Sequence, residues 1–79
     1  MIKILRASSK RDYVVSLEFS DGTFGDYDLA PLLSRNTPLT QPLTQPEEFQ
    51  RFFIELGALC WPNGLELSPP CVREVAASG

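Results

Sequence analysis

The sequence predicts an α+β fold, in which an antiparallel β-meander and short hairpins pack against one main helix and a short C-terminal helix follows. Three observations support this prediction. The N-terminal third alternates apolar and polar residues, as half-buried strands do. Residues 49–56 place aromatic side chains at helical spacing. Residues 60–69 then combine a strand end, a tight turn, a short apolar return and a helix start.

The chain length predicts a single small domain spanning residues 1–79. A chain of this size buries only about 60% of its unfolded surface, so its hydrophobic core is small. Because association buries further apolar area, we expect a protein partner or self-association.

The first expected elements are three strands. Ile2–Ala7 is short and apolar, and Tyr13–Phe19 places every second residue on the core face. An Asp-Gly pair at 21–22 predicts a hairpin turn of type I′, in which both central residues have positive φ. The third strand runs from Thr23 to about Leu29. Its alternation turns Tyr27 inward and Phe24 outward.

The centre of the chain is expected to hold the main helix. One helical turn at 30–33 precedes a doubled Pro-Leu-Thr-Gln at 38–45, and prolines spaced by four predict an extended, polyproline-like connector. Thr44 and Glu47 match a capping box. The helix that follows would place an aromatic stripe against the meander. That stripe consists of Phe49, Phe52, Phe53 and Leu56.

The last third predicts a strand, a turn and a helix. Residues 58–61 are strand-like, an Asn-Gly pair at 63–64 suits a turn, and residues 65–67 return to the core. Ser68 is suited to cap a helix that begins at Pro69 or Pro70. We predict that Trp61 packs in the core, although tryptophan is also common at binding hot spots.

Charge argues against nucleic acid as the main partner, because the net charge is −3. The basic residues are nevertheless uneven. Four of the seven lie in the first eleven positions, namely Lys3, Arg6, Lys10 and Arg11. They form either a small anion-binding patch or, as we favour, a solvated edge strand protected against pairing with other chains.

The residue types that usually carry catalysis are scarce. The absence of histidine removes the commonest general base and metal ligand. Cys60 suits a buried structural thiol, whereas Cys71, near a helix start, is a weak candidate nucleophile. Asp26 and Asp28 share a strand face but lack further ligands. We therefore predict no catalytic residue, no metal site, no cofactor and no small-molecule ligand.

No segment has the apolar stretch of a signal peptide or the roughly 18 apolar residues of a membrane span. We expect a cytoplasmic protein that does not contact membranes and keeps both thiols reduced.

Three stretches, residues 17–29, 42–49 and 61–69, resemble the bacterial domain of unknown function 2442 family. The departures are Glu66, Pro70 and the doubled Pro-Leu-Thr-Gln. Residues that carry the resemblance or shape its turns are Asp21, Gly22, Trp61, Pro62, Gly64, Ser68 and Pro69. The resemblance implies an α+β fold in the bacterial cytosol and no known activity. It also implies a genetic neighbour, since members are often encoded beside another small protein, as in toxin–antitoxin pairs.

These observations predict a non-enzymatic interaction or regulatory module, comparable to an antitoxin-like partner subunit. Its candidate partner-binding residues are Phe24, Asn63 and Glu66. The alternative is an accessory protein that contacts nucleic acid through the basic N-terminal strand.

Overall fold

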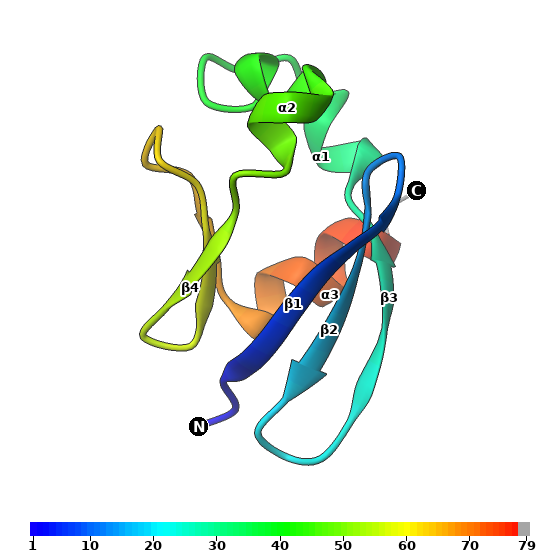
Figure 1. The fold of residues 1–79 in the computed structure, drawn as a ribbon, viewed down its shortest axis with the longest axis vertical. Helices are drawn as coiled ribbons and strands as arrows, with labels where there is room; N and C mark the ends of the chain where they lie inside the picture. Colours follow the sequence, from blue (N-terminus) through cyan, green and yellow to red (C-terminus); the bar gives the residue numbers. More distant parts are fainter. Residues whose placement is uncertain (78–79) are drawn as a thin grey trace.

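The computed structural model describes residues 1–77 and shows two small antiparallel sheets with short helices (Figure 1). The first sheet has the order β1-β2-β3, and the second has the order β4-β5-β6. The strands are β1 Ile4–Arg11, β2 Val14–Phe19, β3 Phe24–Asp28, β4 Phe53–Glu55, β5 Ala58–Cys60 and β6 Glu66–Leu67. The helices are α1 Ala30–Leu33, the 3-10 helix η1 Gln41–Thr44, α2 Pro46–Phe49 and α3 Pro69–Ala77. The predicted α+β class is confirmed.

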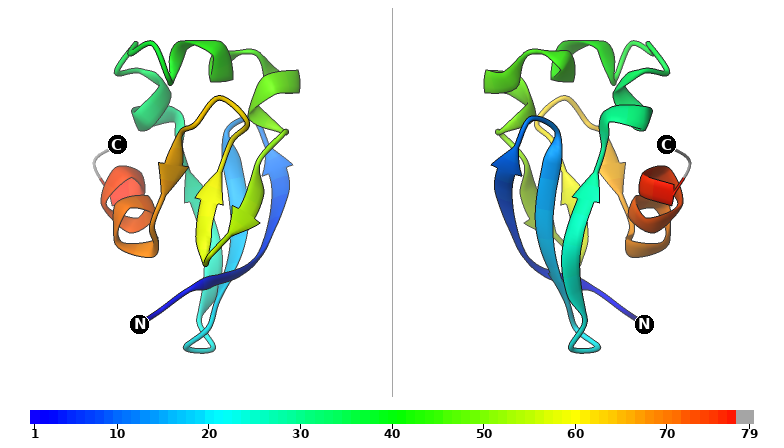
Figure 2. Two further views of the ribbon diagram at one scale, coloured as in Figure 1. Left: turned by 90° about the vertical axis from the view of Figure 1, so that its left-hand side faces the viewer. Right: turned by 90° about the vertical axis from the view of Figure 1, so that its right-hand side faces the viewer.

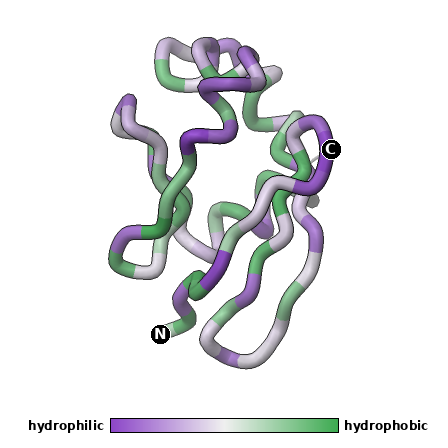
Figure 3. The backbone as a smooth tube through the Cα atoms, in the orientation of Figure 1, coloured by the Kyte–Doolittle hydropathy of each residue, from purple (hydrophilic) through white to green (hydrophobic). Residues whose placement is uncertain are grey.

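The two sheets enclose one hydrophobic core. On one side β1 lies beside β4, and on the other α3 lies beside β3 and β6, while the short helices cross one end (Figure 2). Burial alternates residue by residue along β2 and β3, and the buried residues of β2 are apolar (Figure 3), so the inner face of the sheet contributes to the core. The core is built from both sheets and the helices: Ile4, Val15, Leu17, Phe19, Leu29, Leu32, Leu33, Leu43, Phe49, Leu59, Trp61, Leu67, Val72 and Val75.

The meander is confirmed, with two corrections. The first strand is longer than the expected Ile2–Ala7, because β1 pairs with β2 as far as Arg11 opposite Val14 and the chain turns at 12–13. Two bulges in β1 absorb the additional residues. The turn at 20–22 is not type I′, because Gly22 alone has positive φ. The Gly22 N–H donates to the Phe19 carbonyl at 3.1 Å, as in a three-residue loop with a left-handed glycine.

The prediction of an extended, polyproline-like connector at 38–45 is wrong. Residues 41–44 form the 3-10 helix η1, with a proline in its first turn, where the missing N–H costs nothing. The preceding turn is closed by threonine side chains. The Thr37 N–H donates to the Thr40 hydroxyl at 2.9 Å, and Thr40 is buried. These side-chain hydrogen bonds favour a compact turn over an extended connector.

The predicted main helix is also wrong, because α2 ends at Phe49 and the chain becomes a strand at Phe53. No capping box forms: Gln45 is the N-cap residue, and the Thr44 hydroxyl donates instead to the Gln41 carbonyl at 2.7 Å. The longest helix of the described chain is α3, at the C-terminal end. A second three-stranded sheet therefore covers the meander where a helix was expected.

Backbone geometry at the β4–β5 turn explains why strands form where a helix was predicted. Leu56 and Gly57 both have positive φ, and Glu55 pairs with Ala58, so two residues connect the strands. Such a turn fits the twist of a hairpin. Phe52 and Ile54 then alternate toward the core, while the Leu56 side chain is 93% exposed. Strand pairing overrides the helical spacing of the aromatic residues.

We predict that Leu56→Asn stabilises the protein. A non-glycine residue at positive φ costs about 1 kcal/mol, and asparagine tolerates this geometry better than leucine. The free energy of unfolding should rise by roughly 0.5–1 kcal/mol, which is about 4 °C in Tm for a domain of this size. Thermal unfolding followed by circular dichroism measures the change. Leu56→Ala is the control, because it removes the apolar side chain without favouring positive φ and should not stabilise.

The predicted placement of Trp61 in the core is confirmed, since the residue is 2% exposed. Its ring packs against Phe49 and Phe52, with centroid distances of 5.8 and 6.3 Å. Phe53, which the predicted aromatic stripe placed on the same helix face as Phe49 and Phe52, instead lies on β4 and is 42% exposed. The turn at 62–64 forms as predicted, and α3 begins at Pro69.

The fold closes its core without a partner. Its accessible surface is 4903 Å², close to the roughly 4,800 Å² expected for a folded monomer of this mass. Small size alone therefore gives no reason for an obligate dimer. Within residues 1–77, no helix has the length and apolarity needed to cross a membrane.

Candidate functional site

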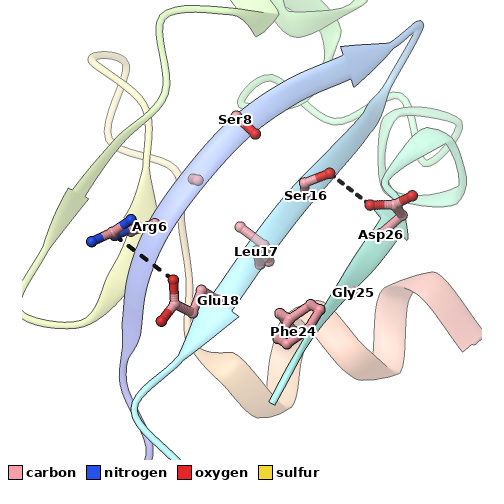
Figure 4. Close-up of a pocket in the computed structure, with 9 residues that line it drawn as sticks. Arg6, Ser8, Ser16, Leu17, Glu18, Phe24, Gly25 and Asp26 are labelled. Atoms are coloured by element: carbon pink, nitrogen blue, oxygen red, sulfur yellow. Dashed lines mark hydrogen bonds and ion pairs between the residues drawn. The ribbon is translucent and has the colours of Figure 1, made fainter. Parts of the chain in front are cut away.

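The solvent-facing side of the β1-β2-β3 sheet carries a regular grid of side chains, which we call the outer face (Figure 4). Strand register sets three rows across the sheet, because residues opposite each other share a face. The rows are Arg6–Glu18–Phe24, Ser8–Ser16–Asp26 and Arg11–Val14–Asp28. A hollow of about 430 Å³ lies over the first two rows. Its volume falls within the usual range of small-molecule pockets, roughly 300–1,000 Å³.

Ion pairs cross this face between strands. Lys10, at the second bulge of β1, reaches over β2 and places its Nζ 2.7 Å from Asp26 Oδ2. The Ser16 hydroxyl donates to the other oxygen, Oδ1, at 2.6 Å. A looser pair joins Arg6 Nε to Glu18 Oε1 at 3.7 Å. Exposed ion pairs such as Arg6–Glu18 add little stability, so either side chain can contact another partner at little cost in free energy.

Acid is expected to weaken the Lys10–Asp26–Ser16 network. The hydrogen bonds from Lys10 first, and then from Ser16, hold the pKa of Asp26 below its ordinary value. Because the folded-state pKa is the lower one, Asp26 stabilises the fold above its unfolded pKa, near 4. That stabilisation is lost as the pH falls through the folded-state pKa.

Asp26→Asn should therefore flatten the fall in unfolding free energy below about pH 4. Urea unfolding between pH 2 and pH 7 measures this slope. The control is Glu74→Gln, since the Glu74 side chain makes no hydrogen bond or ion pair with other described residues. A slope for Asp26→Asn equal to that of the unchanged protein would contradict the prediction.

The four basic residues of the N-terminal strand do not form a patch of one sign. On the outer face, Arg6, Lys10 and Arg11 are accompanied by three carboxylates, those of Glu18, Asp26 and Asp28. Lys3 lies elsewhere, with its Cβ and Cγ against Gly57. Two of the three basic side chains on the face are already paired with carboxylates.

The three candidate partner-binding residues lie apart. Phe24 is 80% exposed at one end of the outer face, beside the hollow. Asn63 is engaged within the chain, because its Nδ2 donates to the Leu39 carbonyl at 2.8 Å and its Oδ1 accepts from the Leu65 N–H at 3.2 Å. Glu66 lies on β6, in the second sheet. Of the three, only Phe24 belongs to the outer face.

Residues 4–74 match the model of a protein family of unknown function, DUF2442. The chain belongs to the DUF2442 family. The match extends from the start of β1 into α3, so it includes both sheets and the whole outer face. No curated protein and no solved structure matches the chain.

In this DUF2442 protein, the residues that carried the resemblance stabilise turns. Asp21 Oδ1 accepts from the Thr23 N–H at 3.1 Å and from the Thr23 hydroxyl at 2.6 Å, and these bonds lower its pKa. Gly22 and Gly64 supply positive φ at two turns. The Ser68 carbonyl accepts from the Val72 N–H in the first turn of α3. Pro62 precedes the turn glycine, and Pro69 is buried at the start of the helix.

The cysteines of the DUF2442 chain are free thiols. Burial, and then the nearby Glu66 carboxylate, raise the pKa of the Cys60 thiol, so it is a poor nucleophile. Cys71 is exposed on α3. Within the described part of the chain, no three residues of the His, Cys, Asp and Glu types form a group that could hold a metal ion.

Ser8, Ser16 and Glu18 line the hollow, but sequence alone did not identify them as residues of the site. The signal was present, because alternation in β2 already turned residues 14, 16 and 18 away from the core. What the sequence lacked was the register that aligns them with β1 and β3.

Proposed function

We propose that this DUF2442 protein is a non-enzymatic protein–protein interaction module whose contact surface is the outer face. The observation that carries this proposal is Phe24, an aromatic side chain 80% exposed beside a hollow of about 430 Å³. Aromatic residues are enriched at interface hot spots, where a partner removes them from water. The surrounding serines, Glu18 and Asp26 supply the polar contacts of an interface rim.

The chemistry of the face supports a binding role over a catalytic one. A general acid or base works best with a pKa near the working pH. The pKa of Asp26 is instead lowered by its two hydrogen-bond donors, and the Cys60 thiol has a raised pKa. Neither group is tuned for catalysis near neutral pH.

The finer role that we propose is that of a regulatory, antitoxin-like subunit in the cytoplasm. Its partner would be a second small protein, such as the product of an adjacent gene. The mixed charge of the outer face suits a reversible contact with another protein, because charged rims contribute specificity and association rate more than affinity.

Capture of the purified neighbouring gene product by the immobilised full chain tests this proposal. Phe24→Ser should weaken capture about tenfold or more, as loss of a hot-spot residue does. Leu56→Asn is the matched control, since it removes an exposed apolar side chain outside the outer face and should not change capture. Equal capture by Phe24→Ser and the unchanged protein, or no capture at all, would contradict the proposal.

A second candidate function is an accessory contact with nucleic acid. It is favoured by the gathering of Arg6, Lys10 and Arg11 on one face, and opposed by the three carboxylates there. It predicts a mobility shift of DNA or RNA at low salt that weakens when these three residues lose their charge. The absence of any shift at low salt would exclude it.

A further inference from the structure

We infer that the outer face binds a second copy of this chain and forms a reversible two-fold dimer. This inference rests on the proposed function because it uses the same outer face, and it goes further by naming a second copy of the chain, which would compete with the neighbouring gene product for that face. The distribution of charge across the three strands supports such a dimer.

The outer face is electrically asymmetric from one strand to the next. The outward charged residues on the β1 side are Arg6, Lys10 and Arg11. The outward residues of β3 are Phe24, Asp26 and Asp28, none of which is basic. The central strand β2 presents Val14, Ser16 and Glu18. One side of the face is therefore basic and the other is acidic and aromatic.

A two-fold axis parallel to β2, placed between two stacked outer faces, exchanges the β1 and β3 sides and keeps each row at its own level. Two copies then meet as complementary rows. Arg6 lies opposite Phe24 of the second copy, and Arg11 lies opposite Asp28 of the second copy, each twice by symmetry. The first pair suits a cation–π contact and the second an ion pair. In the middle row, Ser8 lies opposite the Asp26 carboxylate of the second copy.

The hollow completes this match. It is lined by Arg6, Ser8 and Ser16, the residues that the Phe24 ring of the second copy would approach. The chain already contains one contact of this kind, since the Arg73 guanidinium lies 4.4 Å from the centre of the Phe19 ring. Entry of two Phe24 rings into two hollows would remove the most exposed aromatic side chain from water.

The other two-fold arrangement of stacked faces is disfavoured. An axis across the strands places β1 on β1 and β3 on β3, which opposes like charges on both sides. In the favoured arrangement β2 faces its own copy, so Val14, Ser16 and Glu18 each meet their equivalents. Only Glu18 among them is charged, and the Arg6 guanidinium, with its Nε 3.7 Å from the Glu18 carboxylate, offsets that repulsion. Because the monomer already closes its core, the dimer should be concentration-dependent and sensitive to salt.

Sedimentation equilibrium of the full chain, from about 10 μM to 1 mM, tests the inference. At low salt we expect a dimer, with a dissociation constant at least about tenfold larger at 0.5 M salt, because exposed charges are screened. Phe24→Ser should weaken the dimer by about tenfold or more.

Two charge-reversal variants sharpen the test. In a dimer of the Arg11→Glu variant, each introduced glutamate would face Asp28 of the other copy. In a dimer of the Asp28→Lys variant, each introduced lysine would face Arg11 of the other copy. Both contacts oppose like charges, so each variant alone should be monomeric. Mixed in equal amounts, they should form a heterodimer, because both opposing pairs then have opposite signs. Arg35→Glu is the control, since Arg35 lies in the loop after α1 and should leave the dimer unchanged. Circular dichroism checks folding, because Asp28 Oδ1 also accepts from the Ala30 N–H at 3.0 Å.

A protein that stays monomeric at 1 mM and low salt overturns the inference. The inference is also overturned if Phe24→Ser and the two charge reversals leave the dissociation constant of the dimer unchanged. It is overturned as well if the two reversal variants form no heterodimer when they are mixed. If the chain is monomeric while Phe24→Ser still abolishes capture of the neighbouring gene product, the dimer is wrong and the proposed function stands. If Phe24→Ser also leaves capture of the neighbouring gene product unchanged, both the dimer and the proposed function are wrong.

Discussion

Trp61→Ala is expected to remove a large part of the stability of the chain at 25 °C, about 3–5 kcal/mol. The tryptophan is 2% exposed and packs against Phe49 and Phe52. Replacing a buried tryptophan with alanine costs about 3–5 kcal/mol, through lost burial and the cavity left behind. A domain of this size has a total unfolding free energy of only about 4–12 kcal/mol. Urea unfolding followed by far-UV circular dichroism measures the loss.

The indole contributes a hydrogen bond in addition to volume. Its Nε1–H donates to the Phe49 carbonyl at 2.8 Å, at the end of α2, inside the protein. Trp61→Phe separates the two contributions, because it keeps an aromatic ring but leaves that carbonyl without its donor. A loss of roughly 1–3 kcal/mol is expected for an unsatisfied buried group. An unfolding free energy for Trp61→Ala within 1 kcal/mol of the unchanged protein would show that Trp61 does not anchor the core.

The first sheet could be predicted from sequence because its signals are local. Alternation in Tyr13–Phe19 specifies which face is buried, and a glycine at 22 specifies where the chain turns back. The exact turn type was less accessible, because Asp-Gly fits both a two-residue and a three-residue loop. The same alternation placed Phe24 and Asp26 outward, which the structure confirms.

The middle of the chain could not be predicted, because two patterns coincide there. Phe49, Phe52 and Phe53 fit a helical stripe, whereas Phe52 and Ile54 fit a strand. The choice depends on a partner strand, Ala58–Cys60, and on a leucine that adopts positive φ at 56. Single-residue propensity disfavours that conformation for leucine, so tertiary pairing decides it.

The candidate site was predictable only in part, for a similar reason. Sequence showed which residues of β2 and β3 point away from the core, but not that Lys10 reaches Asp26 across β2. A bulge in β1 shifts the register just before Arg11, and bulges leave little local signal. An apparent basic patch therefore becomes a face with one basic and one acidic side.

Gly57→Ala is expected to be the second most damaging substitution, with a loss of about 2–4 kcal/mol. Gly57 has φ +79°, which costs an alanine about 1 kcal/mol. An added Cβ would also lie 2.6 Å from both Cβ and Cγ of Lys3, closer than real atoms approach. Relief requires β1 to move away from the β4–β5 turn. That movement would break the hydrogen bond from the Ile4 N–H to the Gly57 carbonyl, 2.9 Å long.

Gly64→Ala is the matched control, because Gly64 has φ +99° but nothing lies within 4 Å of an added Cβ. It should lose only the backbone cost of about 1 kcal/mol. Lys3→Gly removes the atoms that clash, so a double-mutant cycle between positions 3 and 57 should show favourable coupling in the unfolding free energy. Equal losses for Gly57→Ala and Gly64→Ala, with no coupling to position 3, would mean that the two sheets are not held together at this contact.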